Sequence, residues 1–243
     1  MNEHNSNGAK IGCAGWTIAK SSAPEFDVAG SHLERYAKRL NAVEINSSFY
    51  RPHQAKTYAR WAGSVPDDFR FSVKIPRTIS HEARLVDSGD TLQTFADQVT
   101  ALGDKLGFLL LQLPPSLVMK TDVVARYFEQ MLRRFSCPIA CEARHASWFN
   151  DEATQLLRQY GITRVLADPV VARSGPHIAT TQASYLRLHG SPRVYYSAYA
   201  DEVIAQISGR FNTPDAWCIF DNTAAGAALP NALALTALLP QFR

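Results

Sequence analysis

Short apolar runs recur along the chain, and the segments between them place apolar residues at a helical period. The runs are apolar almost throughout, as in F-L-L-L-Q-L from Phe108, which is typical of strands buried on both faces of a parallel sheet. Strands that alternate with helices indicate the α/β class. We expect eight strands, at Lys10–Ala14, Ala42–Ile45, Phe69–Ile75, Gly107–Leu113, Ile139–Ala143, Thr163–Ala167, Ser184–His189 and Trp217–Phe220.

The segments between the runs predict helices. In the first of them Leu33, Tyr36 and Leu40 share one face of a helix, and in the fourth Val124 and Phe128 do so. Residues 169–183 contain Pro, Gly and Ser without such a period, so we expect one crossover helix to be degenerate. Further helices are expected over residues 54–61, 92–102, 151–160, 200–208 and 231–239.

Eight strands in 243 residues favour a single-domain TIM-like (β/α)8 barrel over a six-stranded Rossmann sheet. The first strand is not followed by G-x-G-x-x-G, and the sequence has no G-x-x-x-x-G-K-[ST] motif. Repeats and linkers are absent from the sequence as well. We therefore expect the barrel to occupy residues 10–243, after a disordered tail at residues 1–9.

Composition and charge narrow the class of protein. Hydrophobic residues make up 46% of the chain, which excludes a disordered chain. The formal net charge of +3 is too small an excess for a protein that coats nucleic acid or a membrane surface. The apolar runs are far shorter than the roughly 20 residues of a membrane span, and residues 1–10 lack an apolar signal core. We expect a cytoplasmic protein without a membrane partner. The four cysteines form no C-x-x-C pair, and the sequence predicts neither a metal site nor a cofactor.

Polar side chains occur where the predicted strands end. In a barrel of parallel strands these ends meet at one rim, where catalytic groups lie. A charge at one strand end often belongs to a structural salt bridge, but charges at most strand ends favour a functional pocket, because each buried charge is costly unless it is paired. We expect the catalytic residues to be Glu44, Lys74, Glu142 and His189. We expect the substrate contacts to be Asn46, Tyr50, Gln112, Arg144, Asp168, Arg187 and Asn222.

The residue types suggest how these roles are divided. Lys74, Arg144 and Arg187 are suited to hold a phosphate or carboxylate group. Glu44 and Glu142 would orient groups or move protons, and His189 is the acid/base group with the ordinary pKa nearest neutrality. Aromatic and basic residues in the following loops suit a base, a nucleotide, a single strand or a sugar. They include Trp16, Phe49, Arg51, His81, Trp148, Phe149, Arg193, Tyr195, Tyr196 and Tyr199.

Seven segments carry a family resemblance. They are Gly15-Trp16, V-E-I-N-S-S-F-Y-R from Val43, K-I-P-R-T-I-S-H from Lys74, L-L-L-Q-L-P-P-S from Leu109, E-A-R-H-A-S-W from Glu142, Y-L-R-L-H-G from Tyr185 and D-N-T from Asp221. Together they resemble the domain of unknown function 72 family, also called YecE-like, from about Ile11 to Leu239. The resemblance implies a TIM-like barrel in a bacterial or archaeal cytoplasmic protein and supplies no reaction. Asp221-Asn222 stands where the family pattern has two asparagines.

The strand-end residues disfavour several reaction classes. A retaining glycosidase needs two carboxylates about 5 Å apart, whereas the seventh strand supplies Arg187 and His189, and the fourth supplies Gln112. The sequence lacks G-x-S-x-G, and no cysteine stands beside a histidine at a strand end. We therefore expect a barrel enzyme that acts on a phosphorylated or other anionic small substrate by acid/base chemistry, in the isomerase, lyase or hydrolase class.

Two alternatives remain open. A metal-assisted phosphodiesterase on nucleic acid would use Glu142, Asp168, His189 and Asp221 as ligands, although the neighbouring basic residues would crowd a cation. A non-catalytic binder of a nucleotide or a nucleic-acid end would use the basic and aromatic rim.

Overall fold

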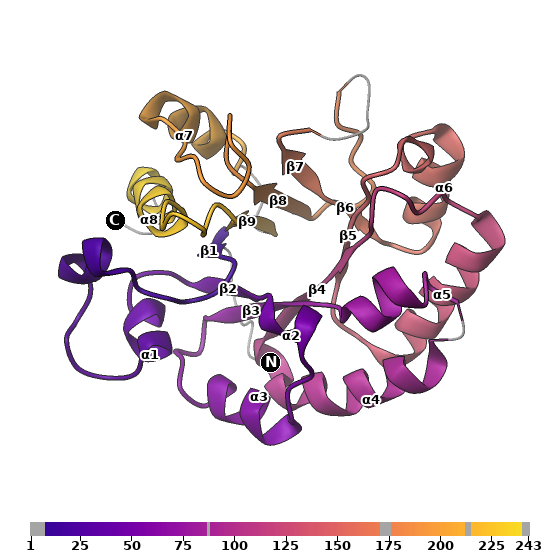
Figure 1. The fold of residues 1–243 in the computed structure, drawn as a ribbon, viewed down its shortest axis with the longest axis horizontal. Coiled ribbons are helices and arrows are strands. Elements are labelled where there is room, and N and C mark those ends of the chain that lie inside the picture. Colours follow the sequence, from indigo (N-terminus) through magenta and orange to yellow (C-terminus); the bar gives the residue numbers. More distant parts are fainter. Residues whose placement is uncertain (1–7, 87, 171–175, 212–214, 240–243) are drawn as a thin grey trace, which may run out of the picture.

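The computed structural model describes residues 8–86, 88–170, 176–211 and 215–239, where strands alternate with helices as predicted (Figure 1). The strands are β1 (Lys10–Cys13), β2 (Ala42–Ile45), β3 (Arg70–Lys74), β4 (Leu106–Gln112), β5 (Ile139–Glu142), β6 (Thr163–Arg164), β7 (Leu166–Asp168), β8 (Ser184–Leu188) and β9 (Ala216–Phe220). The α-helices are α1 (His32–Ala37), α2 (Ser47–Tyr50), α3 (Ala55–Ala62), α4 (Gly89–Val99), α5 (Thr121–Arg134), α6 (Asp151–Gln159), α7 (Asp201–Ser208) and α8 (Ala228–Leu238).

The strands pair in parallel and form two sheets. One has the order β1-β9-β8-β7 and the other β2-β3-β4-β5-β6. Each of the eight predicted strands is present, and the sixth is divided into β6 and β7 at Val165. The α/β class with parallel sheets is confirmed. Because the hydrogen-bond ladders stop between β1 and β2 and between β6 and β7, the closed barrel stays a prediction.

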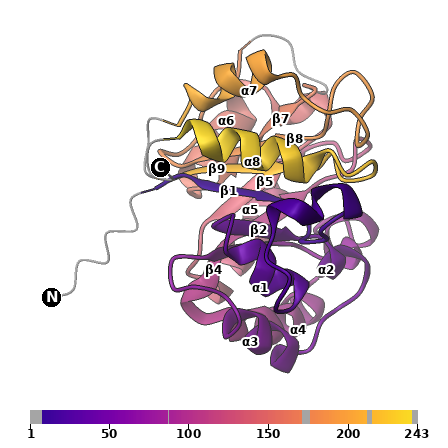
Figure 2. The same ribbon diagram turned by 90° about the vertical axis from the view of Figure 1, so that its left-hand side faces the viewer.

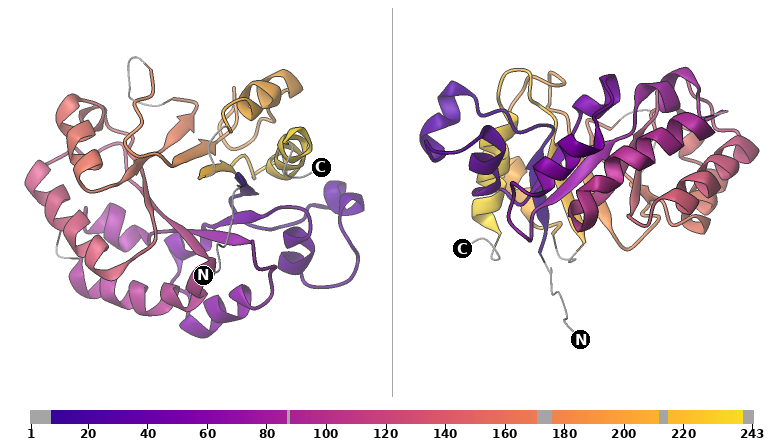
Figure 3. Two further views of the ribbon diagram at one scale, coloured as in Figure 1. Left: turned by 180° about the vertical axis from the view of Figure 1, so that it is seen from behind. Right: turned by 90° about the horizontal axis from the view of Figure 1, so that it is seen from below.

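Helices lie outside both sheets. In Figures 1 and 3, α3, α4 and α5 follow the outer face of the five-stranded sheet, while α7 and α8 flank the four-stranded sheet. The described residues between β7 and β8 contain no helix, in agreement with the predicted degenerate crossover, and residues 171–175 of that segment lie outside the description. Within the described ranges, no helix combines the length and apolar character needed to cross a membrane.

A small core of strand side chains fills the space between the sheets. Phe108, Tyr185 and Trp217 form its centre, with ring centroids 5.2 Å apart for Phe108 and Tyr185 and 5.4 Å apart for Phe108 and Trp217. A glycine at position 107 is required here, because a Cβ would come within 2.5 Å of the Trp217 ring. The larger core packs the sheets against the helices. The inner core therefore supports the carboxyl ends of the strands from below.

Side chains replace the ladder where β1 passes β2. The hydroxyl of Tyr36 accepts a hydrogen bond from the Cys13 amide at 2.8 Å and donates one to the Ala42 carbonyl at 2.9 Å. Asn41 bonds the Ile11 amide and the Ala9 carbonyl, each at 2.9 Å. Ala9 is thus buried and bonded, so the packed chain begins before the end of the predicted tail, of which residues 1–7 are not described. Figure 2 shows β1 and β2 lying next to each other, with α8 and α1 flanking them.

We predict that Tyr36→Phe lowers the free energy of unfolding by roughly 2–4 kcal/mol, because it leaves a buried amide and a buried carbonyl without partners. Urea denaturation measures the change. Tyr127→Phe is the matched control, since the buried Tyr127 hydroxyl has no hydrogen-bond partner among the described residues. We expect this control to be neutral or stabilising. Equal effects of the two substitutions would show that Tyr36 does not join the strands.

Candidate active site at the carboxyl ends of the strands

Arg187 of β8 is the centre of a buried ionic cluster. Its side chain is 0% exposed. Its Nε and Nη2 donate to the two carboxylate oxygens of Glu44 on β2, at 3.0 and 2.6 Å. Its Nη1 donates to Glu142 on β5 at 2.7 Å, and its Nη2 lies 3.1 Å from Asp221, which follows β9. One guanidinium therefore joins carboxylates from both sheets.

His189 lies between two of these carboxylates. Its Nδ1 is 3.0 Å from Asp221 and its Nε2 is 3.0 Å from Glu142. Burial alone would lower the pKa of His189, but the hydrogen bonds to Asp221 and Glu142 outweigh it and raise that pKa above its ordinary value. Ionised carboxylates only accept hydrogen bonds, so both ring nitrogens must donate. His189 is thus held as an imidazolium.

The carboxylates are ionised for the complementary reason. Burial would raise the pKa of Glu142, but the charge of Arg187 and the hydrogen bond from His189 hold it well below its ordinary value. The same two neighbours lower the pKa of Asp221 against the effect of its burial. Arg144 adds two hydrogen bonds to Glu142, at 3.2 and 3.0 Å, and remains partly exposed.

Lys74, at the end of β3, is buried differently from the other basic groups. Its side chain is only 7% exposed, and its Nζ lies 4.2 Å from the centroid of the Phe49 ring in α2. It forms no ion pair with any described residue. Burial, helped by the charge of Arg187, lowers the pKa of Lys74 to about 8, although the three carboxylates act in the opposite direction. Lys74 is therefore a desolvated amine at the edge of the cluster.

Two residues outside the predicted catalytic and substrate-binding sets support the cluster. The Tyr185 hydroxyl, which belongs to the inner core, is 2.9 Å from Glu44 and 2.7 Å from the Ser72 hydroxyl. Tyr185, Arg187 and His189 alternate along one strand, so a period of two could have predicted that they share a face. Asp221 was expected only as a metal ligand in the phosphodiesterase alternative and as a departure from the family pattern, yet it binds both Arg187 and His189.

The remaining predicted residues have different positions. Asn46 donates to Asp221 Oδ1 at 3.4 Å, and its own buried Oδ1 has no partner among the described residues. Gln112 is buried and stands next to Glu142 in the strand register. Asp168 accepts a hydrogen bond from Tyr199 at 2.8 Å and takes no part in the cluster. Tyr50 is 74% exposed and packs only against Phe49 among the ring contacts of the described residues.

Two expected substrate contacts need correction. Arg187 is fully buried and its donors face three carboxylates, so it positions those groups instead of touching a substrate. Asn222 is fully buried as well, and its Nδ2 bonds the Ser197 carbonyl at 2.9 Å and the Asn231 side chain at 3.0 Å. Both residues shape the site from beneath.

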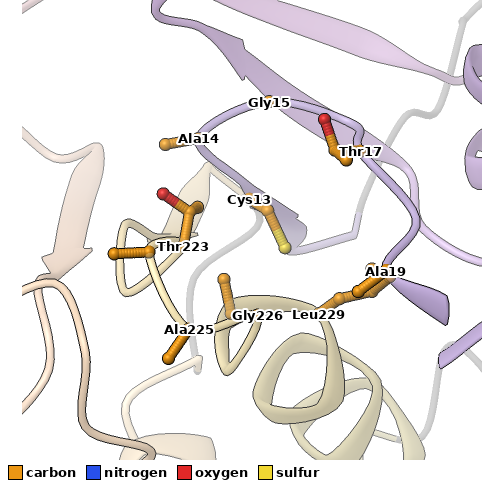
Figure 4. A pocket seen from close by; sticks show the side chains of 11 residues that line it. Cys13, Ala14, Gly15, Thr17, Ala19, Thr223, Ala225, Gly226 and Leu229 are labelled. Atoms are coloured by element: carbon orange, nitrogen blue, oxygen red, sulfur yellow. The ribbon is translucent and has the colours of Figure 1, made fainter. Parts of the chain in front are cut away.

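A cavity of about 540 Å³ lies between the loops that follow β1 and β9 (Figure 4). Its lining from the described residues carries no charge; the polar side chains are Thr17, Thr223 and the thiol of Cys13. Burial raises the pKa of Cys13 to about 12, which keeps the thiol protonated. Such a lining suits an uncharged group.

The cluster is also unsuited to hold a metal ion. Among the described residues, no group of three or more His, Cys, Asp or Glu side chains is arranged as a metal site. The carboxylates of Glu44, Glu142 and Asp221 already face Arg187, and Glu142 faces Arg144 too. A cation would have to displace these bonds.

Fold and site together define an α/β protein of parallel strands with a buried ionic cluster at their carboxyl ends. A family model described as "Protein of unknown function DUF72" matches residues 10–242, and the chain belongs to this family.

Relatives and solved structures agree with this assignment. The chain is 33% identical over 153 residues to the UPF0759 protein YecE of Escherichia coli (strain K12), a match that covers 60% of this chain and 55% of that protein. It is 27% identical over 148 residues to the UPF0759 protein YunF of Bacillus subtilis (strain 168), covering 58% of this chain and 52% of YunF. These matches therefore span about half the length of the curated relatives.

Two solved structures of the family have the same fold. A DUF72 family protein of Enterococcus faecalis V583 has a TM-score of 0.79 at 21% identity, with 95% of each chain covered. A DUF72 family protein of Thermotoga maritima MSB8 has a TM-score of 0.75 at 24% identity, covering 95% of this chain and 98% of that one.

We predict that Arg187→Met lowers the free energy of unfolding at pH 7 by about 3–5 kcal/mol, because three buried carboxylates lose their shared cation. In the unmodified protein the lowered pKa values of Glu142 and Asp221 contribute stability above their ordinary values of 4.5 and 3.8, and this contribution is lost as the pH falls through the folded values. In the variant this dependence should reverse. Urea denaturation at pH 7 and pH 4 measures both effects.

The control for this prediction is Arg126→Met, which removes an exposed ion pair to Asp122 and should change stability by less than about 1 kcal/mol. An Arg187→Met variant as stable as this control would contradict a central role for Arg187.

We predict the opposite sign for Lys74→Met. Lys74 has a folded pKa of about 8 against an ordinary value of 10.5, so its charge destabilises the fold below pH 8, and the penalty is relieved as the pH rises toward 10.5. The substitution should therefore raise the free energy of unfolding by about 2 kcal/mol at pH 7, and by less at pH 10. Thermal and urea denaturation at both pH values measure the difference.

Lys10→Met provides the matched control, because Lys10 is also buried but donates to the Asp68 carbonyl at 2.9 Å. We expect no gain in stability from this control. Destabilisation by Lys74→Met would show that Lys74 serves the fold.

Proposed function

We propose that the ionic cluster is the active site of an enzyme that acts on a small anionic substrate by acid/base chemistry. The observation that carries the proposal is Lys74, a buried amine without an ion pair among the described residues, next to a His and three carboxylates. Lysine is rarely buried unless it is paired, and unpaired burial lowers stability. A group that costs stability at a strand end is best explained by a role in chemistry.

We also infer that the two sheets are parts of one barrel. Tyr36 and Asn41 join β1 to the loop and strand beside it, and the Gly15 amide donates to the Glu44 carbonyl at 2.9 Å. At the junction between β6 and β7, the Val165 amide donates to the Cys141 carbonyl at 3.0 Å. This bond continues the pairing of β5 and β6. A closed wall explains why Glu44, Glu142 and Arg187 converge from strands of different sheets.

The balance of charge supports an anionic substrate. The cluster contains the carboxylates of Glu44, Glu142 and Asp221. The cluster also contains four basic groups, which are Lys74, Arg144, Arg187 and His189. When Lys74 is protonated, these groups exceed the three carboxylates by one positive charge. Arg144, whose side chain is 22% exposed, is the most accessible of the four, and we assign to it the binding of the anion.

His189 is the assigned acid, because it holds two protons between carboxylates. Glu142 and Glu44 orient His189 and Arg187, respectively. The cytoplasm remains the proposed location, and the four described cysteines, all free, fit a reducing compartment.

The alternatives are less well supported. A metal-assisted phosphodiesterase would need carboxylates that are here bound to Arg187 and Arg144. A nucleic-acid binder would rely on the rim, where Arg193 stacks on Tyr196 at 3.9 Å from the ring centroid. Binding at the rim would depend on Arg193, whereas binding at the cluster would depend on Arg144.

We predict that Arg144→Ala weakens the binding of inorganic phosphate at least about tenfold, since a charge-assisted hydrogen bond contributes roughly 1.5–3 kcal/mol. Arg193→Ala, on the rim, should leave phosphate binding unchanged. Calorimetric titration of both variants and the unmodified protein, with phosphate and with a short oligonucleotide, measures this. If the unmodified protein binds no phosphate, or if both variants lose affinity equally for the oligonucleotide, the small-anion site is wrong.

A further inference from the structure

The exclusion of Lys74 from the ion pairs follows from competition among the basic groups. Both oxygens of Glu44 accept from Arg187, and Glu142 accepts from Arg187, Arg144 and His189. Glu44 and Glu142 are therefore occupied by these other donors. The Nζ of Lys74 is left over the face of Phe49, close enough to the cluster to sense its charges but without a hydrogen-bond acceptor among the described residues.

We propose that Lys74 forms a Schiff base with the carbonyl group of a small anionic oxo compound, such as a 2-oxo acid, whose anionic group is bound by Arg144. This inference rests on the proposed function and names its substrate class. The structure supplies three requirements of such a site. Lys74 is an amine shielded from water, Arg144 is a partly exposed cation whose charge acts together with that of Lys74 on His81, and ionised acid/base groups lie in the same cluster.

The step is balanced without a further reactant. The lone pair of Nζ forms a bond to the carbonyl carbon, and the carbonyl oxygen takes up a proton to give a carbinolamine. The hydroxyl then leaves as water with a second proton while the C=N bond forms. Counted from the ammonium form, one Lys74 and one carbonyl compound give one protonated imine and one water, with the charge unchanged.

Asp221 is the assigned proton carrier for this step. Its Oδ2 is held by Arg187 and His189, but its Oδ1 has only the long contact of 3.4 Å from Asn46. Of the carboxylate oxygens in the cluster, Asp221 Oδ1 thus has the weakest contact among the described residues. Through a bridging water, it can take a proton from the carbinolamine nitrogen and return one to the departing hydroxyl.

The surroundings of Lys74 also favour its reactive form. Arg187 lowers the pKa of Lys74, while Glu44, Asp221 and Glu142 raise it, and burial leaves it at about 8. The His81 ring packs 5.0 Å from the Phe49 ring, and burial together with the Lys74 charge lowers the pKa of His81. At pH 7 a pKa of about 8 leaves about one Lys74 in ten as the free amine, against roughly one in three thousand for the ordinary value.

Reductive trapping tests the proposal on the unmodified protein. The full chain is incubated at pH 7 with pyruvate and sodium cyanoborohydride, and peptide mass spectrometry measures the adduct at each lysine. Lys74 should be modified at least about ten times faster than the exposed Lys56 and Lys120, and its rate should level off above about pH 8. Modification of Lys74 no faster than of Lys56 overturns the proposal.

Hydroxyacetone, a neutral ketone of similar size, separates this proposal from the function on which it rests. Arg144→Ala should slow the pyruvate adduct at Lys74 about tenfold and leave the hydroxyacetone adduct unchanged. If both ketones modify Lys74 quickly and Arg144→Ala slows neither reaction, the Schiff base is supported and anion recognition by Arg144 is rejected. Phosphate binding that depends on Arg144, without any preferred adduct at Lys74, rejects the Schiff base alone.

Discussion

The bond between Arg187 and three carboxylates is the interaction on which the site depends. The side chain crosses from one sheet to the other, and its fully buried guanidinium reaches Glu44, Glu142 and Asp221 from three different strands or strand ends. Glu142 and Asp221 in turn fix both nitrogens of His189. Without this cation the carboxylates would neither stay ionised in the interior nor converge. Arg187 thus places three carboxylates directly and His189 through two of them.

The cluster and the apolar core below it form one unit. Tyr185 packs against Phe108 and Trp217 in the inner core, while its hydroxyl reaches Glu44 and Ser72. The ionic groups therefore stand on an aromatic base that limits their movement. Lys74 is the exception in this unit, since it has burial without an ion pair among the described residues. Burial disfavours the charged form of Lys74, so this position costs stability.

The sequence predicted the strands well because each is a short apolar run, and it predicted that Glu44, Glu142 and His189 would meet because parallel strands end together. It could not predict which charges pair. From its sequence neighbours alone, Arg187 cannot be distinguished from an arginine that binds an anion. Only the distances to Glu44 and Glu142 show that carboxylates of the protein occupy its hydrogen-bond donors. The four-residue helix α2 was missed because S-S-F-Y is too short to display a period, although it carries the ring under Lys74. The break between β6 and β7 at Val165 has no signal in a continuous apolar run.

The pairing of β1 with β9 also sets the order in which the molecule can fold. Ile11 stands opposite Cys218, so the first strand must wait for the last, whereas β2 to β6 are neighbours in sequence and can assemble as they are synthesised. The carboxylates of Glu44 and Glu142 belong to this early part, and Arg187 and Asp221 to the late one. Until the late strands arrive, those two acids remain hydrated. The ionic cluster is thus completed in the same event that completes the core, and a chain that stops short of β8 never buries an unpaired charge there.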